Sequence, residues 1–352
     1  MFAEINSIHA FNILKLFQSA LFPSGHHILS SWAPTQERSI LVSFPLSGPM
    51  VGTVLASLLT GFLCDYGFDG GWPSSFYLFG LASLLWAVGW LCFIRDTPGQ
   101  HSSITAKEKL YVETNTNKSC EGEISFSNAP WLAIATSPAV WAIIFGHICF
   151  NWIFYTLWTQ LPTYFKDVLH LPASWNGVVT SIPFLCNFIC INISGIVSDA
   201  LRHKGMSTVT VRKLAYGFGM FSAAISIAAA SFAGCHLPSV VVLVCLSFGL
   251  SGFSMASFMA NIVDIAPEYS SIIMAISKTA SAIPGIVSPL VTGALVNGAS
   301  TVENWRIVFL IAANFSCIGG ILFIILAKGE IQTWATSKKK APELVINEQS
   351  SL

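Results

Sequence analysis

The chain has 352 residues, of which 53% are hydrophobic and only 10% are charged. A soluble domain carries roughly 25% charged residues, so this composition argues against a soluble enzyme and against a disordered chain. The formal net charge is zero. Because no basic field is present to attract a phosphate backbone, we expect no nucleic-acid partner.

The cysteines and the hydroxyl residues show no pattern typical of catalysis. Most of the nine cysteines lie in apolar stretches, and their spacing matches neither a zinc site nor a disulfide framework. Serine, histidine and aspartate occur without nucleophile-elbow spacing, and no glycine-rich phosphate loop is present. We therefore expect neither an enzyme nor an ATP-driven pump, and we expect no metal and no cofactor.

Apolar segments of about 20 residues, the length that spans a bilayer, recur along the whole chain. We predict nine spans, of which the first gives the weakest signal, near 10–31, 40–64, 74–94, 138–161, 177–198, 213–234, 238–262, 270–296 and 305–327. Glycine and proline inside them are tolerated in membrane helices, where neighbouring helices satisfy the backbone. The predicted fold is an all-α polytopic membrane protein within a lipid bilayer.

Loop cations predict the orientation. With alternating loops, thirteen lysines and arginines fall on one side: Arg38, Arg95, Lys107, Lys109, Lys118, Arg202, Lys204, Arg212, Lys213, Lys328, Lys338, Lys339 and Lys340. The other side holds only Lys166 and Arg306. Since cytoplasmic loops carry the excess of basic residues, the cation-rich side and the C-terminus are predicted to be cytoplasmic.

The one long polar segment divides the chain. We predict a partial N-terminal helical half of about three spans at 1–94, a cytoplasmic linker at 95–132, a six-helix half at 133–335 and a cytoplasmic tail at 336–352. Transporters built from two equal halves would give six and six. Either the protein is asymmetric, or three spans are missing from its start.

A short motif follows the fifth predicted span. Gly195, Asp199 and Arg202 form the pattern G-x-x-x-D-x-x-R at a cytoplasmic helix end. Gly195 permits a close helix approach, and the charges can hold two helices together in one conformation. The pattern resembles the loop signature of the major facilitator superfamily and predicts a conformational gate. The alternative is an ordinary helix end with positive-inside charges.

Longer motifs extend this resemblance from about residue 22 to 335. In chain order they are W-A-P-T-Q-E-R-S at 32–39, G-W-P at 71–73, N-W at 151–152, F-Y-T-L at 154–157, L-P-T-Y at 161–164, V-R-K at 211–213, D-I-A-P at 264–267, I-P-G at 283–285 and K-G-E at 328–330. They resemble the anion-transporter family of sialin, the vesicular glutamate transporters and the sodium-phosphate cotransporters, and sialin most of all. The resemblance implies a major facilitator fold.

The chain also departs from the family pattern. Family members have twelve spans, and this chain resembles them from the fourth onward. Residues 15–23 are about four residues shorter than the family pattern, roughly one helical turn, and contain no glutamate. We therefore expect residues 1–21 not to be family sequence. Ile262 stands where the family has histidine, beside Asp264, which we interpret as a structural or gating charge.

The span at 138–161 carries His147, Asn151, Tyr155 and Thr159. Four-residue spacing keeps their side chains on one helix face, and such polar stripes usually face the bundle interior. Asn151 and Tyr155 are therefore candidate substrate ligands, and His147 is a candidate proton carrier. The alternative is that these groups bond to neighbouring helices.

Two later spans add further candidates. In 270–296, Ser277, Lys278 and Ser281 lie along one side, continued by Gly285, Ser288 and Thr292. Lys278 and Ser281 are candidate substrate ligands, although Lys278 can instead snorkel to the cytoplasmic edge. In 238–262 we select Ser251.

The resemblance implies secondary active transport of an organic anion, an acidic sugar or an acidic amino acid, by proton symport and alternating access. Inorganic phosphate with sodium is the next candidate. The implied location is a lysosomal or vesicular membrane, or the plasma membrane. A second hypothesis is a non-transporting truncated isoform or fragment, since the chain lacks the first three spans and the charged residues of the fourth.

Overall fold

The computed structural model describes residues 21–34, 36–101, 103–116, 129–171, 173–234, 236–296 and 300–335. Every regular element in these ranges is helical, and eight helical spans in them are long and apolar enough to cross a membrane, one of which, Ser270–Val296, is divided between two helices. The all-α polytopic prediction is therefore confirmed for this part of the chain. Residues 10–20 of the first predicted span lie outside the described residues.

The elements run in one order along the chain. They are α2 (Leu21–Trp32), α3 (Arg38–Tyr66), α4 (Trp72–Phe93), η1 (Pro98–Gln100), α5 (Ala106–Asn115), α6 (Trp131–Thr136), α7 (Pro138–Asp167), α8 (Ala173–His203), α9 (Thr208–Phe232), α10 (Leu237–Ile265), α11 (Ser270–Ala280), α12 (Ala282–Val296), α13 (Val302–Leu326) and η3 (Thr333–Ala335). The long polar segment contributes the short helix α5.

The helices differ from the predicted spans in two ways. α7 and α8 run on to Asp167 and His203, because a helix continues beyond the apolar stretch that hydropathy detects. The span at 270–296 is broken into α11 and α12 at Ser281. Pro284 explains the break, since it has no N–H to donate to the carbonyl of Ala280 and its ring crowds that carbonyl.

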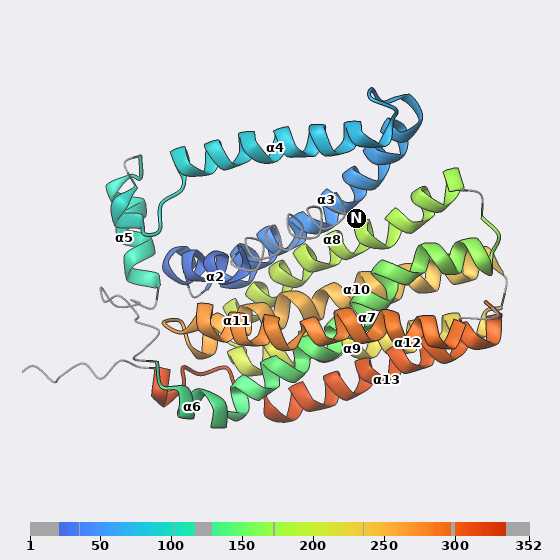
Figure 1. Ribbon diagram of the computed structural model, residues 1–352. Coiled ribbons are helices and arrows are strands. Elements are labelled where there is room, and N and C mark those ends of the chain that lie inside the picture. The colour runs from blue at the N-terminus through green and yellow to red at the C-terminus, as the bar shows by residue number, and fades with distance from the viewer. Residues whose placement is uncertain are drawn as a thin grey trace, which may run out of the picture.

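The long helices lie side by side (Figure 1). α8 packs on both α3 and α10, α9 on α10 and α13, and α7 on α13 and α12. Aromatic rings of Tyr164, Trp305 and Phe309 pack against one another between α7 and α13. α4 follows α3 through a short turn and contacts it far less than α8 does, and none of its apolar window is buried.

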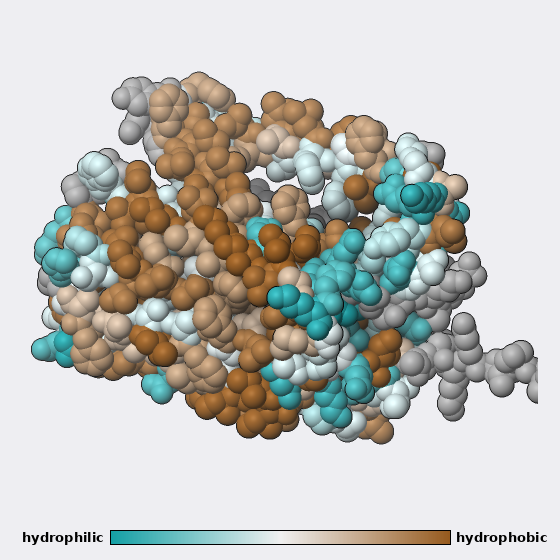
Figure 2. Space-filling view, turned by 180° about the vertical axis from the view of Figure 1, so that it is seen from behind, coloured by the Kyte–Doolittle hydropathy of each residue, from teal (hydrophilic) through white to brown (hydrophobic). Residues whose placement is uncertain are grey.

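The bundle has two distinct ends. α3, α7, α9 and α11 begin at one end, where α8, α10 and α13 finish (Figure 1). We call this the Arg38 end, and the opposite end, near Lys166 and Arg306, the Lys166 end. Figure 2 shows a largely hydrophobic face with hydrophilic residues gathered toward the ends. The cations that the sequence assigns to one side therefore share the Arg38 end wherever the structure describes them.

Candidate functional site

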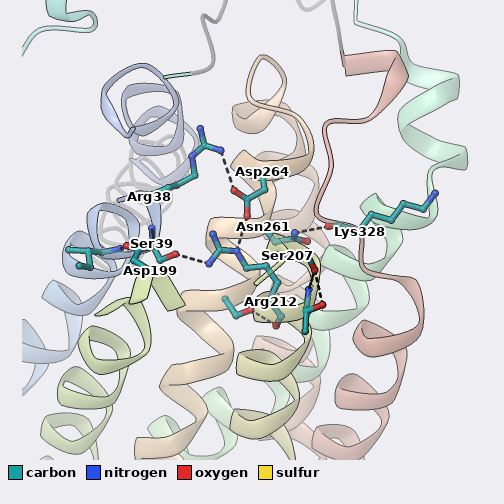
Figure 3. A network of polar contacts seen from close by, with 11 residues as sticks. Arg38, Ser39, Asp199, Ser207, Arg212, Asn261, Asp264 and Lys328 are labelled. Atoms are coloured by element: carbon teal, nitrogen blue, oxygen red, sulfur yellow. Dashed lines mark hydrogen bonds and ion pairs between the residues drawn. The ribbon is translucent and has the colours of Figure 1, made fainter. Parts of the chain in front are cut away.

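A buried carboxylate joins three helices at the Arg38 end. Asp264, next to the last residue of α10, accepts from Arg38 Nη1 at 3.2 Å through Oδ1 and from Arg212 Nε at 2.7 Å through Oδ2 (Figure 3). Arg38 is the first residue of α3, and Arg212 lies near the start of α9. Both arginines are 1% exposed. One carboxylate therefore ties α3 to α9 and α10.

A second carboxylate holds the same helix start. Asp199 of α8 accepts from the backbone N–H groups of Ser39 at 3.2 Å and Ile40 at 2.9 Å. The first N–H groups of a helix have no partner within it, and the helix dipole favours negative charge there. Arg212 Nη1 also donates to Ser39 Oγ at 2.8 Å. We call Arg38, Ser39, Asp199, Arg212 and Asp264 the Asp264 cluster.

Gly195 allows α8 to reach this cluster. A Cβ at Gly195 would overlap Ser43 Oγ and lie 3.0 Å from the carbonyl oxygen of Ser39. Gly195 and Asp199 are four residues apart, so both face α3. The glycine lets the two backbones approach closely, and this approach brings the Asp199 carboxylate to the start of α3.

The four predicted gate residues therefore gather at one place. Gly195, Asp199 and Asp264 have the contacts just given. Arg202, half-buried at the end of α8, interacts electrostatically with both carboxylates. Their role as a gate stays a prediction.

Sequence reasoning missed two central members. Arg38 and Arg212 were counted as loop cations and stand in two of the family motifs, but neither was selected as a site residue. Each lies at or near the start of an apolar helix and is fully buried. A guanidinium on the bundle side of a spanning helix needs a buried partner, which was the available signal.

His147 and Asn151 of the predicted stripe on α7 contact α11 and Ser281, whereas Thr159 of that stripe is exposed. The contact with α12 is made by Thr156, which the predicted stripe did not include. His147 Nδ1 lies 2.6 Å from Ser277 Oγ, and Thr156 Oγ1 lies 2.6 Å from Ser288 Oγ. Between them, Asn151 Nδ2 donates to the Ser281 carbonyl oxygen at 3.1 Å. We call these contacts the α7 seam, and they bond neighbouring helices.

Asn151 has a specific place in this seam. Ser281 is the residue at the break between α11 and α12, where the regular bonding of the helix is interrupted. The Asn151 amide donates to its carbonyl and so helps to satisfy the broken backbone. One turn further along α7, the Tyr155 ring packs against Gly285, where a Cβ would lie 3.1 Å from the ring. Tyr155 is half-buried, and its hydroxyl has no hydrogen-bond partner among the described residues.

The other two substrate candidates are placed differently. Ser251 lies between α10 and α8, where its Oγ donates to the Phe248 carbonyl at 2.6 Å and accepts from Asn187 Nδ2 at 3.3 Å. Lys278 is half-buried near the end of α11, one residue from Ser277 of the seam. Helical periodicity identified buried positions such as Asn151 and Ser277 but misplaced Thr159, which is exposed, and it could not identify which faces meet. Asn151, Tyr155 and Ser281 therefore come together, and Ser251 lies apart from them.

The polar linker also touches this end. Tyr111 of α5 donates to Glu37 Oε1 at 3.0 Å, and Glu37 immediately precedes Arg38. The hydrogen bond to Glu37, together with the charge of that carboxylate, raises the pKa of Tyr111 above its ordinary value. Trp32 Nε1 donates to the Arg95 carbonyl at 3.1 Å. Two contacts thus tie the short stretch before α3 to the linker that follows α4.

Known proteins are similar to this chain over most of its length. The sequence profile of the Major Facilitator Superfamily matches residues 10–289. An uncharacterized transporter of Caenorhabditis elegans, slc-17.2, is 39% identical over 95% of this chain. Sheep sialin is 38% identical over 92% of the chain, and bovine vesicular glutamate transporter 2 is 36% identical over 93%.

These alignments cover 69% of slc-17.2, 64% of sialin and 56% of the glutamate transporter, so the chain spans about two thirds or less of their lengths. The profile covers most of the chain, and the relatives are well above 30% identity. The chain is therefore an integral, multi-pass membrane protein of the Major Facilitator Superfamily, and within it belongs to the family of sialin and the vesicular glutamate transporters.

Proposed function

We propose that the chain acts in secondary active transport of a small organic anion by alternating access. The observation that carries this proposal is the Asp264 cluster. It joins α3, upstream of the 95–132 linker, to α8, α9 and α10, downstream of it. The cluster closes the Arg38 end, and losing these contacts would open that end.

Contacts within the downstream helices support this mechanism. Ser257 Oγ of α10 donates to the Arg212 carbonyl at 2.7 Å, and Ser254 Oγ donates to the Tyr216 carbonyl at 2.9 Å. These bonds join α9 to α10 without involving α3. α3 can therefore leave the cluster while α9 and α10 stay together, as a rocking motion of two helical groups requires.

The proposed organisation follows the chain order. Residues 1–94 form a partial N-terminal half, 95–132 the linker, 133–335 a six-helix half and 336–352 the tail. We assign the Arg38 end, the linker and the C-terminus to the cytoplasm, from the excess of loop cations. The proposed location is a lysosomal or vesicular membrane, with the plasma membrane as the alternative.

For the substrate we propose an acidic sugar or an acidic amino acid with protons as the coupling ion. In proteoliposomes with an imposed proton gradient, the 352-residue chain should accumulate N-acetylneuraminate or glutamate. A protonophore should abolish the uptake, and protein-free liposomes are the control. Phosphate uptake driven by a sodium gradient would instead support the second substrate and ion.

A non-transporting chain is the alternative that one observation favours. α4 packs on α3, but none of its apolar window is buried in the described residues. If this alternative holds, the 352-residue chain should take up no substrate in the proteoliposome assay. A chain extended by the upstream segment of sialin should then transport in the same vesicles.

The Tyr155 hydroxyl is the proposed contact with the substrate. A buried hydrogen bond contributes about 0.5–1.5 kcal/mol, so Tyr155→Phe should raise the apparent substrate constant several-fold without lowering expression. The measurement is concentration-dependent uptake in whichever chain transports, with Trp158→Phe as a control on the same helix. Equal apparent substrate constants for wild type and Tyr155→Phe would contradict a contact between the hydroxyl and the substrate. The role of Tyr155 would then be its packing against Gly285.

A further inference from the structure

A groove lies between α8 and α10, which pack side by side (Figure 1). It has a volume of about 420 Å³, and its lining residues come from 182–190 of α8 and 241–250 of α10. Each of them is apolar or a cysteine. Ile182, Ile189 and Val242 on its walls are exposed, whereas Val240 and Val244 on the other side of α10 are fully buried. The groove therefore faces away from the bundle interior and toward the lipid.

Small side chains create the hollow. Cys186, Cys190, Cys245 and Gly249 are among the lining residues, and the three cysteines are free thiols. At Gly249 the helices approach so closely that a Cβ would lie 3.0 Å from the Cβ of Cys186. Along α10 the lining runs over nine residue steps, or about 13 Å at 1.5 Å per residue. The result is a shallow, elongated groove.

One end of the groove reaches polar and aromatic groups. Both helices begin at the Lys166 end, and the lining starts about one helical turn into α10. Ser239 precedes Val242 by three residues and so lies on the same helix face, and its Oγ lies 2.8 Å from Nδ1 of the exposed His236. On α8 the exposed Trp175 precedes Ile182 by seven residues, and tryptophan is enriched at membrane interfaces. The groove thus has a small hydrogen-bonding group above an apolar channel.

The charges around the groove favour an uncharged head group. The segments 175–190 and 236–250 contain no lysine, arginine, aspartate or glutamate. The two cations of this end stand on other helices, Lys166 on α7 and Arg306 on α13, where Arg306 Nε donates to the Ser231 carbonyl at 3.2 Å. Anionic lipids are typically held by basic pockets between membrane helices. The groove provides no such pocket.

We propose that the groove binds one sterol, with its ring system lying along α8 and α10 and its hydroxyl at Ser239. A sterol has a single small uncharged polar group, which matches the hydroxyl of Ser239. Its fused rings are rigid, so it loses little conformational freedom on binding, whereas a fatty acyl chain must freeze many torsions in the same shallow groove. The bound sterol contacts both helices and should stabilise their packing. This inference depends on the membrane location of the helices and not on transport or a transported substrate.

The test uses the 352-residue chain in phosphatidylcholine vesicles that contain a trace of diazirine-bearing cholesterol. After irradiation, mass spectrometry should find the label concentrated in residues 182–190 and 241–250. Excess unlabelled cholesterol should lower this labelling several-fold. The same amount of diacylglycerol, which combines a small uncharged head with flexible chains, should leave it unchanged.

Three variants locate the site. Cys245→Phe places a ring in the groove and should lower the labelling several-fold, whereas Cys92→Phe, the same change at an exposed cysteine of α4, should not. Ser239→Ala removes the proposed hydroxyl partner and should also weaken labelling, which keeps the test decisive if Cys245→Phe does not give monodisperse protein.

Three results would overturn the proposal. The first is label spread over the exposed faces of α4, α9 and α13 as densely as over the groove. The second is competition by diacylglycerol equal to that by cholesterol, which would mean that the groove takes acyl chains. The third is undiminished labelling of the groove in folded Cys245→Phe and in Ser239→Ala.

Discussion

Asp264→Asn is expected to destabilise the protein by about 3–5 kcal/mol, because it leaves two buried guanidinium groups without their shared carboxylate. Asp264 is the only acidic partner of Arg38 and Arg212 among the ion pairs of the described residues. Asparagine keeps the size of the side chain but removes the charge. The measurement is the apparent unfolding temperature in detergent, together with the yield of monodisperse protein.

Two further variants show whether the charge is responsible. Asp96 lies at the same end and is exposed, so Asp96→Asn should change the unfolding temperature little. Adding Arg38→Met to Asp264→Asn removes one of the stranded cations and should recover part of the loss, a coupling that double-mutant cycles measure. An Asp264→Asn protein as stable as Asp96→Asn would show that the Arg38–Asp264–Arg212 contacts contribute no net stability.

Hydropathy was sufficient for most of the fold because a bilayer demands one property of every span. Eight of the predicted spans, from 40–64 onward, correspond to helical spans in the described residues, of which 270–296 is divided between α11 and α12. Their ends were placed less well, since polar residues such as Lys166 continue a helix without being apolar. The break at Ser281 was missed, although Pro284 is its local cause.

The sequence predicted which residues line the candidate site, but it did not predict which of them contact one another. Spacing placed His147, Asn151 and Tyr155 on one face, and placed Ser277 and Ser281 on another. Nothing in one sequence states that these faces meet in the α7 seam, since that depends on how the helices pack. In the structure, His147 and Asn151 form hydrogen bonds to neighbouring helices, which is the alternative that the sequence analysis gave for these residues.

The same limit explains why the arginines were overlooked. Asp199 was selected with Arg202, three residues away, because a sequence motif shows only local neighbours. In the structure its oxygens reach Ser39 and Ile40, about 160 positions earlier in the chain. Arg38 and Asp264 are separated by 226 positions. Buried ion pairs across such separations follow from the packing of α3 on α8 and α10.

Gly195→Ala is expected to separate α3 from α8. The added Cβ would overlap Ser43 Oγ and crowd the backbone of α3, with Ser39 O at 3.0 Å and Ile40 Cα at 3.2 Å. A side chain can rotate away, but the α3 backbone must shift. Overpacking of this kind costs about 1–3 kcal/mol. Because the bonds from Ser39 and Ile40 to Asp199 depend on this approach, they should be lost with it.

Gly293→Ala provides the matched control, since Gly293 also lies within a helix but a Cβ there meets nothing within 4 Å. Alanine in open space should be neutral or stabilising by about 0.5–1 kcal/mol. Both changes are made in a Ser47→Cys background, because Ser47 of α3 is fully buried. A water-soluble maleimide should label Ser47→Cys faster with Gly195→Ala than with Gly293→Ala, and the unfolding temperature should fall only with Gly195→Ala. Equal labelling and equal stability would show that α3 does not depend on the close approach at Gly195.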